Sequence, residues 1–216
     1  QGSILGPLLF LIYINDLSKN LESDVKLFAD DTSIFSVVND PVLSANILNN
    51  DLMKIQEWAH QWKMSFNPDA LKQAQEVIFS RKNIKPNHPV LHFNQTEVNR
   101  TVSQKHLGII LDEKLNFNQH LKAAMDKTTK GISIIRKLRY YIPRTSLITL
   151  YKSFIRSHLD FADFIYDQPN NKTLCDKIES IQYNATLTIR GAKRGTSKDK
   201  LYKEFSLKYL SSRRWF

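Results

Sequence analysis

Cysteine is almost absent from this 216-residue sequence, because Cys175 is the only one. A single cysteine excludes an internal disulfide, a zinc knuckle and a cysteine-rich metal cluster. The six histidines show no metal-ligand spacing such as His-Glu-x-x-His, so structural or surface roles are expected for them. The sequence also contains no internal repeat and no low-complexity tract.

Long hydrophobic runs are missing as well. The densest, 7–14, falls far short of the roughly 20 residues that a membrane-spanning helix needs, and Asn15-Asp16 ends it. We interpret this run as a helix buried in a core, and we expect neither a membrane partner nor a targeting segment. Because the sequence opens with Gln1 and reaches an apolar run at Ile4, we expect a chain that begins inside a domain.

Apolar residues make up 42% of the sequence and aromatic residues 11%, which is enough for a buried core. The net charge of +10 is unevenly distributed. Residues 1–120 hold 11 Lys+Arg and 13 Asp+Glu, whereas residues 121–216 hold 20 and 8. The basic half favours a polyanionic partner, either nucleic acid or an anionic membrane surface.

The pattern of residues 25–38 predicts a β-hairpin. Two apolar, β-favouring segments, 25–29 and 32–38, are separated by the turn formers Asp30 and Asp31. We therefore expect both aspartates at the tip of the hairpin.

Helical and strand patterns alternate around this hairpin. Asp40 and Pro41 are a good N-cap and first-turn pair for a helix that runs to about Met64. Short strands are predicted at 76–80, 90–93 and 106–111. The first 117 residues therefore predict an α+β domain, a mixed sheet with covering helices.

From residue 118 onward the strand signals disappear. Helices are predicted at about 118–140, 144–158 and 172–190, with a shorter one after Ser197. This change places a candidate domain boundary near residue 117, so that 118–216 form an α-helical region.

The paired carboxylates carry the clearest chemistry. Two aspartates at a tight hairpin tip concentrate negative charge at a fixed place, and Mg²⁺ is its natural counter-ion. In two-metal phosphoryl transfer, carboxylates from separate segments converge on two such ions. For an isolated Asp-Asp pair, ordinary turn chemistry is the simpler interpretation.

The pair does not stand alone, because the surrounding motifs resemble those of reverse transcriptases of jockey-type non-LTR retrotransposons. Phe28-Ala29-Asp30-Asp31 is similar to the family's aromatic-x-Asp-Asp signature, and residues 1–10 with 13–17 resemble the preceding palm motif. The resemblance implies that Asp30 is a metal ligand and Asp31 a supporting carboxylate. It places Gln1, Gly2, Phe28 and Ala29 in the nucleotide and template pocket.

Further stretches extend the resemblance over practically the whole chain. Residues 62–69 are similar to the next palm motif. After it, Lys72 is the candidate to protonate or neutralise the leaving pyrophosphate. A solvated lysine is the simpler interpretation of Lys72. Residues 106–112 resemble the segment that grips the primer end, with Leu107 and Gly108 at its centre; a plain strand glycine also explains Gly108. The sequence departs from many members at Ile189-Arg190-Gly191, where they read Ile-Thr-Gly.

The basic half offers candidates for contacts with the nucleic-acid backbone. One group lies along the first predicted helix of that half: Lys122, Lys127, Lys130, Arg136, Lys137 and Arg139. A second group surrounds a glycine-containing loop: Arg190, Lys193 and Arg194, followed by Lys198 and Lys200. Contacts of this kind give affinity without base specificity. A solvated helix face is the alternative for each individual lysine.

The resemblance implies a partial polymerase palm at 1–117 and a basic α-helical thumb and connection at 118–216. Its activity would be RNA-directed DNA synthesis with two Mg²⁺ ions, an RNA template, a DNA primer and deoxynucleoside triphosphates, in the nucleus and cytoplasm. We expect this chain alone to be inactive, because family palms take another aspartate and the fingers from upstream of the first motif. The alternatives are a non-catalytic nucleic-acid-binding relic of a mobile element and, more remotely, a Mg²⁺-dependent phosphohydrolase.

Overall fold

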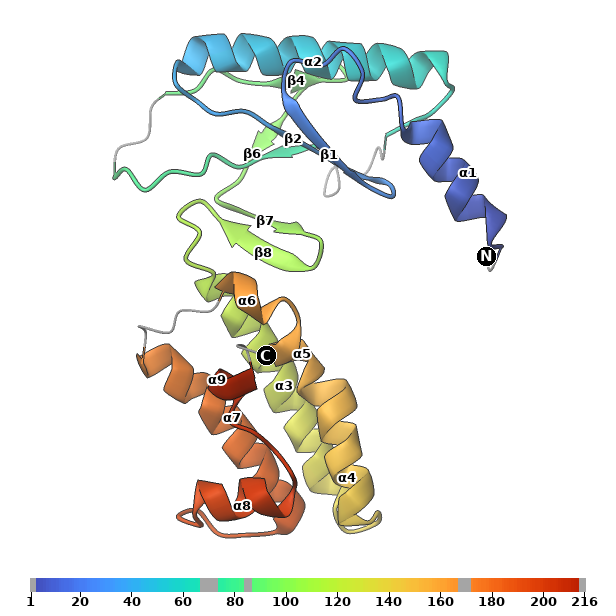
Figure 1. The fold of residues 1–216 in the computed structure, drawn as a ribbon. Helices are drawn as coiled ribbons and strands as arrows, with labels where there is room; N and C mark the ends of the chain where they lie inside the picture. Colours follow the sequence, from blue (N-terminus) through green and yellow to red (C-terminus); the bar gives the residue numbers. More distant parts are fainter. Residues whose placement is uncertain (1–2, 67–73, 84–86, 167–171, 214–216) are drawn as a thin grey trace. The chain divides into compact units, whose positions relative to one another are not determined.

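The computed structural model describes residues 3–66, 74–83, 87–166 and 172–213 (Figure 1). Two compact units divide the chain: Gln1–Val102, here called unit 1, and Ser103–Phe216, called unit 2. None of the helices in the described residues combines the length and hydrophobicity of a membrane span.

Unit 1 is built around the long helix α2 (Pro41–Gln61), which lies over the hairpin strands β1 (Asp24–Phe28) and β2 (Asp31–Phe35) (Figure 1). The predicted start of α2 is confirmed. The Asp40 side chain accepts hydrogen bonds from the backbone N–H groups of Val42 at 2.8 Å and Leu43 at 3.1 Å. These bonds satisfy two of the donors that the first turn of a helix leaves without partners.

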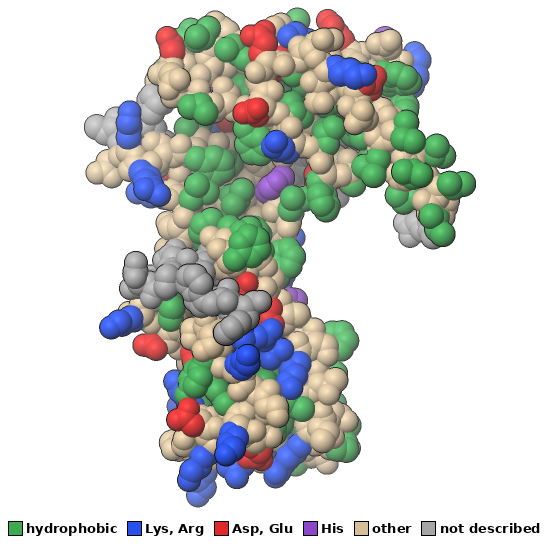
Figure 2. All heavy atoms as spheres, in the orientation of Figure 1, with side chains coloured by type: hydrophobic (Ala, Val, Ile, Leu, Met, Phe, Trp, Pro, Cys, Tyr) green, Lys and Arg blue, Asp and Glu red, His purple; other side chains and the backbone are tan. Residues whose placement is uncertain are grey.

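The first helix, α1 (Leu5–Ile14), corrects the prediction of a buried helix. Five large apolar side chains are each more than half exposed: Leu5, Leu8, Leu9, Leu11 and Ile12. Figure 2 shows hydrophobic side chains covering this helix. The sequence pattern was that of a core helix, but in the described residues only its C-terminal end, at Ile14, is buried.

The short strands of unit 1 correct the prediction of one mixed sheet. β3 (Gln75–Glu76) pairs in parallel with β6 (Asn99–Arg100), and β4 (His92–Phe93) pairs antiparallel with β5 (Thr96–Glu97). Within the described ranges, these ladders and β1–β2 form separate two-stranded sheets. Strands of two residues offer too few backbone bonds to extend a common sheet. The mixture of helices and strands is confirmed.

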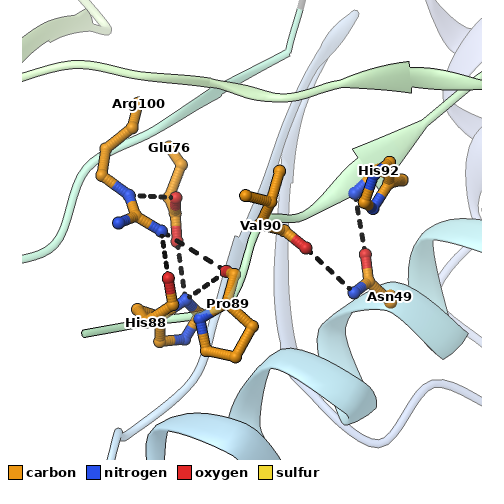
Figure 3. A network of polar contacts seen from close by, with 7 residues as sticks. All are labelled: Asn49, Glu76, His88, Pro89, Val90, His92 and Arg100. Atoms are coloured by element: carbon orange, nitrogen blue, oxygen red, sulfur yellow. Dashed lines mark hydrogen bonds and ion pairs between the residues drawn. The ribbon is translucent and has the colours of Figure 1, made fainter. Parts of the chain in front are cut away.

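A polar network joins these short ladders (Figure 3). Glu76 accepts from Arg100 Nε at 2.8 Å and lies 3.2 Å from Nδ1 of the buried His88. Arg100 also donates to the carbonyl of His88 at 2.9 Å. Asn49 of α2 then accepts from the backbone N–H of His92 at 2.8 Å, which ties β4 to the helix. Side-chain bonds therefore hold this region where the strands themselves are short.

Unit 2 begins with a hairpin, β7 (Ser103–His106) and β8 (Ile109–Asp112), where one continuous strand was predicted. Leu107 and Gly108 form its turn, with φ angles of 45° and 89°. Positive φ at both turn residues is the pattern of a type I′ turn, which matches the twist of paired strands. A strand across 106–111 was therefore wrong because Leu107-Gly108 turns the chain.

The rest of unit 2 is helical, as predicted. Its elements are α3 (Asn118–Leu138), α4 (Arg144–Leu150), the π-helical turn η1 (Tyr151–Ile155), α5 (Ser157–Asp160), α6 (Asp163–Tyr166), α7 (Lys172–Arg190), α8 (Lys198–Glu204) and α9 (Leu210–Arg213). α3 packs along α7 through an apolar face in which Leu121 and Ile135 are fully buried. The boundaries agree with those expected from helical periodicity.

The β7–β8 hairpin is bonded to the helices that follow it. The Asp112 carboxylate accepts from the backbone N–H of Phe117 at 2.8 Å and of Asn116 at 3.2 Å, at the start of α3. His120 of α3 accepts from Ile110 N at 3.4 Å. These bonds explain why the structural division lies before Ser103. The palm–thumb domain boundary expected near residue 117 stays a prediction.

A buried polar network connects α7 with the last helices of unit 2. Glu179 accepts from the Tyr202 hydroxyl at 2.6 Å and from the backbone N–H of Leu210 at 2.9 Å. Gln182 accepts from the Tyr151 hydroxyl at 3.1 Å. Burial raises the pKa of both tyrosines, so both stay protonated as donors. Each bond would leave a buried polar group unsatisfied if it were broken.

Candidate active site

The hairpin that carries the paired aspartates has a two-residue turn. Phe28 pairs with Asp31, so Ala29 and Asp30 form the turn and Asp31 is the first residue of β2. The turn is therefore one residue earlier than predicted. Ala29 has a φ of 51°, and positive φ at the first turn position is the pattern of a type II′ turn. A non-glycine residue in this region costs energy, of order 1 kcal/mol, that the surrounding structure must offset.

The two faces of the hairpin have different roles. Leu27 and Ile34 point inward and pack against the buried cluster of Ile14, Leu17 and Ile55. Phe28 and Asp31, which face each other across the strands, lie on the outer face because side chains alternate along a strand. The hairpin is therefore held by one face while its tip and other face are exposed.

This core joins three segments that carry the sequence motifs described above. Tyr13, near the end of α1, contacts Trp58 and Trp62 of α2 edge-on, with ring centroids 6.0 and 5.3 Å apart. The indole of Trp58 donates to Asp16 at 3.2 Å. Residues 13–17, the hairpin and the end of α2 thus pack on one another within unit 1, although they are far apart in the sequence.

Asp51 fixes the chain where the hairpin begins. Its carboxylate is completely buried and accepts from the backbone N–H groups of Glu22 at 3.1 Å and Ser23 at 2.8 Å. Lys54 donates to the same carboxylate at 3.4 Å and to the carbonyl of Asn20 at 2.9 Å. Burial alone would raise the pKa of Asp51, but the hydrogen bonds from Ser23, Glu22 and Lys54 outweigh it and lower that pKa.

Asp51 is not among the residues predicted from the sequence. An aspartate inside a helix has no spacing signal that separates it from a solvated one. Its bonds run to backbone groups about 28 residues away, and only the packing of α2 on the hairpin brings them together.

Asp30 and Asp31 are both exposed, and neither carboxylate bonds to another described residue. Their oxygens suit a hard cation such as Mg²⁺, which prefers oxygen ligands. In the described part of the chain, no three Asp, Glu, His or Cys side chains converge as a metal site. Unit 1 therefore supplies a donor pair from one turn.

Two of the five residues predicted for the nucleotide and template pocket lie in the described part of the chain. Phe28 and Ala29 lie in the hairpin itself, and the Phe28 ring is exposed. Gln1, Gly2 and Lys72 lie outside the described residues.

The predicted primer-end residues lie in unit 2, at the tip of the β7–β8 hairpin. Leu107 is partly exposed, and Gly108 packs against the ring of Phe161. A methyl group at Gly108 would come within 3.1 Å of the Phe161 ring. The tip can accept no larger residue at Gly108 without movement of that ring.

The cations of the first group lie on the outside of α3. Lys122, Lys130 and Lys137 are separated by eight and seven residues, about two helical turns each, so they share one exposed face. Lys127 and Arg136 are exposed as well, and Arg139 is half-buried.

The second group surrounds the end of α7. Lys193 and Arg194 are exposed, whereas Arg190 forms an ion pair with Glu204 at 2.9 Å. This pairing partly neutralises Arg190 and makes it the weaker candidate for a phosphate contact.

Comparison with known proteins places the hairpin in a family. Residues 1–111, which include the aspartate pair and the β7–β8 turn, match the family described as reverse transcriptase (RNA-dependent DNA polymerase). This match covers more than half of the chain. The chain belongs to the reverse transcriptase family.

Curated reverse transcriptases of mobile elements match most of the chain. The RNA-directed DNA polymerase from mobile element jockey of Drosophila melanogaster is 25% identical over 89% of the chain and 22% of its own length. The jockey polymerase of Drosophila funebris is 27% identical over 89% and 22%. A probable RNA-directed DNA polymerase from transposon X-element of Drosophila melanogaster is 23% identical over 96% and 23%.

These matches confirm the resemblance to jockey-type non-LTR elements. The chain spans about a fifth of the length of these reverse transcriptases. Their matched regions extend beyond the family match and include most of unit 2. No solved structure matches the chain.

Proposed function

We propose that residues 1–216 are part of an RNA-directed DNA polymerase of a non-LTR retrotransposon, with a partial palm at 1–117 and a basic α-helical thumb at 118–216. The observation that carries this proposal is the exposed pair Asp30-Asp31 at the tip of a hairpin inside the reverse transcriptase match. The polymerases named above support the same activity.

Asp30 is the principal metal ligand in this proposal, and Asp31 is a supporting carboxylate. Two bound Mg²⁺ ions would activate the primer 3′-hydroxyl and stabilise the charge of the leaving pyrophosphate. The chain itself holds the two carboxylates in place. Asp51 anchors the backbone directly before β1, and Leu27 and Ile34 fix the inner face of the hairpin. The hairpin tip can therefore bind metal ions with little reorganisation of the backbone.

The substrates in this proposal are an RNA template, a DNA primer and deoxynucleoside triphosphates, handled inside the cell. Gln1, Gly2, Phe28, Ala29 and Lys72 are assigned to the nucleotide and template pocket. Leu107 and Gly108 are assigned to the primer end. These assignments follow the family's motifs.

Residues 1–216 alone are proposed not to extend a primer. Asp30 and Asp31 give two exposed carboxylates from a single turn, and two divalent ions require ligands from more than one segment. Primer extension by the 216-residue chain that disappears in Asp30→Ala would contradict this.

The polymerase proposal is tested in a protein extended to the length of the relatives. Asp30→Asn removes the charge with almost no change in shape, and we expect it to abolish primer extension on an RNA template. Asp24→Asn is the matched control, because Asp24 is an exposed aspartate at the other end of β1. Retained activity in Asp30→Asn would show that the catalytic turn lies elsewhere.

A non-catalytic nucleic-acid-binding protein is the second candidate. The charge of unit 2 favours it, because residues 103–216 hold 22 Lys+Arg and 10 Asp+Glu. Such a protein would bind nucleic acid with the salt dependence of phosphate contacts, yet the extended wild-type protein would not extend a primer.

A further inference from the structure

The turn between α3 and α4 exposes two neighbouring aromatic rings. Tyr140 is 74% exposed and Tyr141 is 83% exposed. Both side chains lie almost entirely outside the core of unit 2, so neither is needed to fill it. Adjacent aromatic rings that are exposed to solvent are candidates for contact with a ligand.

The backbone under these rings is fixed. The N–H groups of Tyr141 and Ile142 donate to the carbonyl of Leu138 at 2.9 and 3.1 Å, which closes the end of α3. Ile142 packs against the core of unit 2, and Pro143 leads into α4. The rings therefore project from a rigid base rather than from a loose loop.

Arg139 orders the first ring. Its guanidinium carbon lies 4.6 Å from the centroid of the Tyr140 ring, and Nη2 donates to the Tyr140 hydroxyl at 2.7 Å. A cation against one ring face is a favourable arrangement. It lowers the conformational freedom that Tyr140 would lose on binding a ligand.

The surroundings of the two rings are cationic. Residues 136–144 contain four cations and no acidic residue: Arg136, Lys137, Arg139 and Arg144. In Figure 1 the C-terminal ends of α3 and α7 lie at the same, lower end of unit 2, together with α8. Figure 2 shows Lys and Arg side chains gathered over that end.

The C-terminal end of a helix favours cations, which explains the charge at the end of α3 but not the exposed rings. Exposed aromatic rings among cations match the chemistry of single-stranded nucleic acid, whose bases stack and whose phosphates are negative. A helix that binds a lipid surface presents a broad apolar face of Trp, Phe and Leu side chains. In 136–144 the large exposed apolar side chains are instead the two tyrosines.

We propose that Tyr140 and Tyr141 form a stacking platform for unpaired bases of single-stranded RNA or DNA, flanked by Arg136, Lys137 and Arg144 as phosphate contacts. The inference rests on the proposed function, because it assumes that unit 2 handles nucleic acid. It adds a site for unpaired bases to the phosphate contacts along α3. Stacking tolerates any base, as copying of any sequence requires.

The test uses the full 216-residue chain and two probes of equal length, an unstructured oligothymidylate and a blunt duplex. Fluorescence anisotropy at fixed salt gives both affinities. In the double variant Tyr140→Leu and Tyr141→Leu we expect single-strand affinity to fall roughly tenfold or more, with duplex affinity within about twofold. Tyr140→Phe with Tyr141→Phe keeps both rings and should retain single-strand binding.

Phe164→Leu is the matched control. Phe164 is 75% exposed in α6, at the opposite end of unit 2 in Figure 1. This substitution should leave both affinities unchanged. Photo-cross-linking to an oligonucleotide that contains 5-iodouridine should place adducts on Tyr140 or Tyr141. Circular dichroism confirms that each variant keeps its helices.

The outcomes separate this inference from the function on which it rests. Wild-type binding to both probes with no loss in the leucine variant would overturn the stacking platform alone. An equal loss on both probes would also overturn it, because stacking requires unpaired bases. No binding of wild type to either probe at low salt would overturn both proposals. Stronger competition by polyglutamate than by oligothymidylate would assign the surface to an acidic protein.

Discussion

Asp51 of α2 accepts a hydrogen bond from the backbone N–H of Ser23 at 2.8 Å, directly before the first strand of the aspartate-bearing hairpin. The carboxylate is completely buried, and its other bonds run to Glu22 and Lys54. A residue outside every recognised motif therefore determines where the hairpin enters unit 1.

Replacement of this carboxylate should destabilise unit 1. Asp51→Asn removes the charge and places an amide N–H₂ where two backbone donors need acceptors, so we expect a loss of about 1–3 kcal/mol. Glu57→Gln is the control, because it makes the same change at an exposed position of α2. Urea unfolding measures both, and equal stabilities of the two variants would contradict the anchoring role.

The effect of Asp51 should depend on pH. Its pKa in the folded chain is lowered below the ordinary value of 3.8, so the unfolded chain binds the proton more tightly. Stability from this group is complete above pH 3.8 and is lost as the pH falls through the lower folded pKa. The difference in unfolding free energy between wild type and Asp51→Asn should therefore shrink below about pH 4. A difference that grows with acidification would show the opposite sign.

Gly108 should tolerate alanine poorly. Its φ of +89° disfavours any L side chain, and the added methyl would meet the Phe161 ring at 3.1 Å. We expect Gly108→Ala to destabilise the chain by about 1–2 kcal/mol or more. Gly195→Ala separates the two causes, since Gly195 has a φ of +96° with no neighbour within 4 Å. Thermal unfolding should rank Gly108→Ala below Gly195→Ala, and the reverse order would rule out the contact with Phe161.

The α3 cations should determine how binding responds to salt. Each neutralised phosphate contributes about −0.9 to the slope of log K against log salt, so five or six contacts give a slope near −5. Replacing Lys127, Lys130 and Lys137 with Gln should make it shallower by up to about 3 without changing preference among duplex sequences.

The control for this experiment carries the same loss of charge elsewhere. Lys19, Lys63 and Lys82 are exposed lysines of unit 1, and their replacement by Gln should change the slope little. Equal effects of the two triple variants would mean that net charge, rather than contact along α3, determines the affinity.

Local patterns predicted the helices of unit 2 and the start of α2, because each depends on nearby residues. The Asp40 cap and the apolar spacing from Leu121 to Ile135 illustrate this. The hairpin was predicted, but its turn lies one residue earlier than predicted, since the positive φ of Ala29 carries no composition signal.

The sequence predictions that failed concern features that depend on distant parts of the chain. The apolar composition of α1 predicted burial, but burial also requires a neighbouring layer of structure. In the described residues, only the end of α1 at Ile14 is buried. The strand predicted at 106–111 became a hairpin because Leu107 and Gly108 adopt positive φ. The contact of Asp51 with Ser23 likewise depends on tertiary packing.

The most direct test of the central claim is the position at which a divalent ion binds this chain. Mn²⁺, a paramagnetic substitute for Mg²⁺, broadens the amide resonances of residues near it. In the 216-residue chain we predict that weak Mn²⁺ binding broadens the resonances of 29–32 first, that Asp30→Asn removes this broadening, and that Asp24→Asn leaves it. Unchanged broadening at 29–32 in Asp30→Asn, or broadening centred on another acidic segment such as 112–113, would contradict the assignment of the aspartate turn as the metal-binding site.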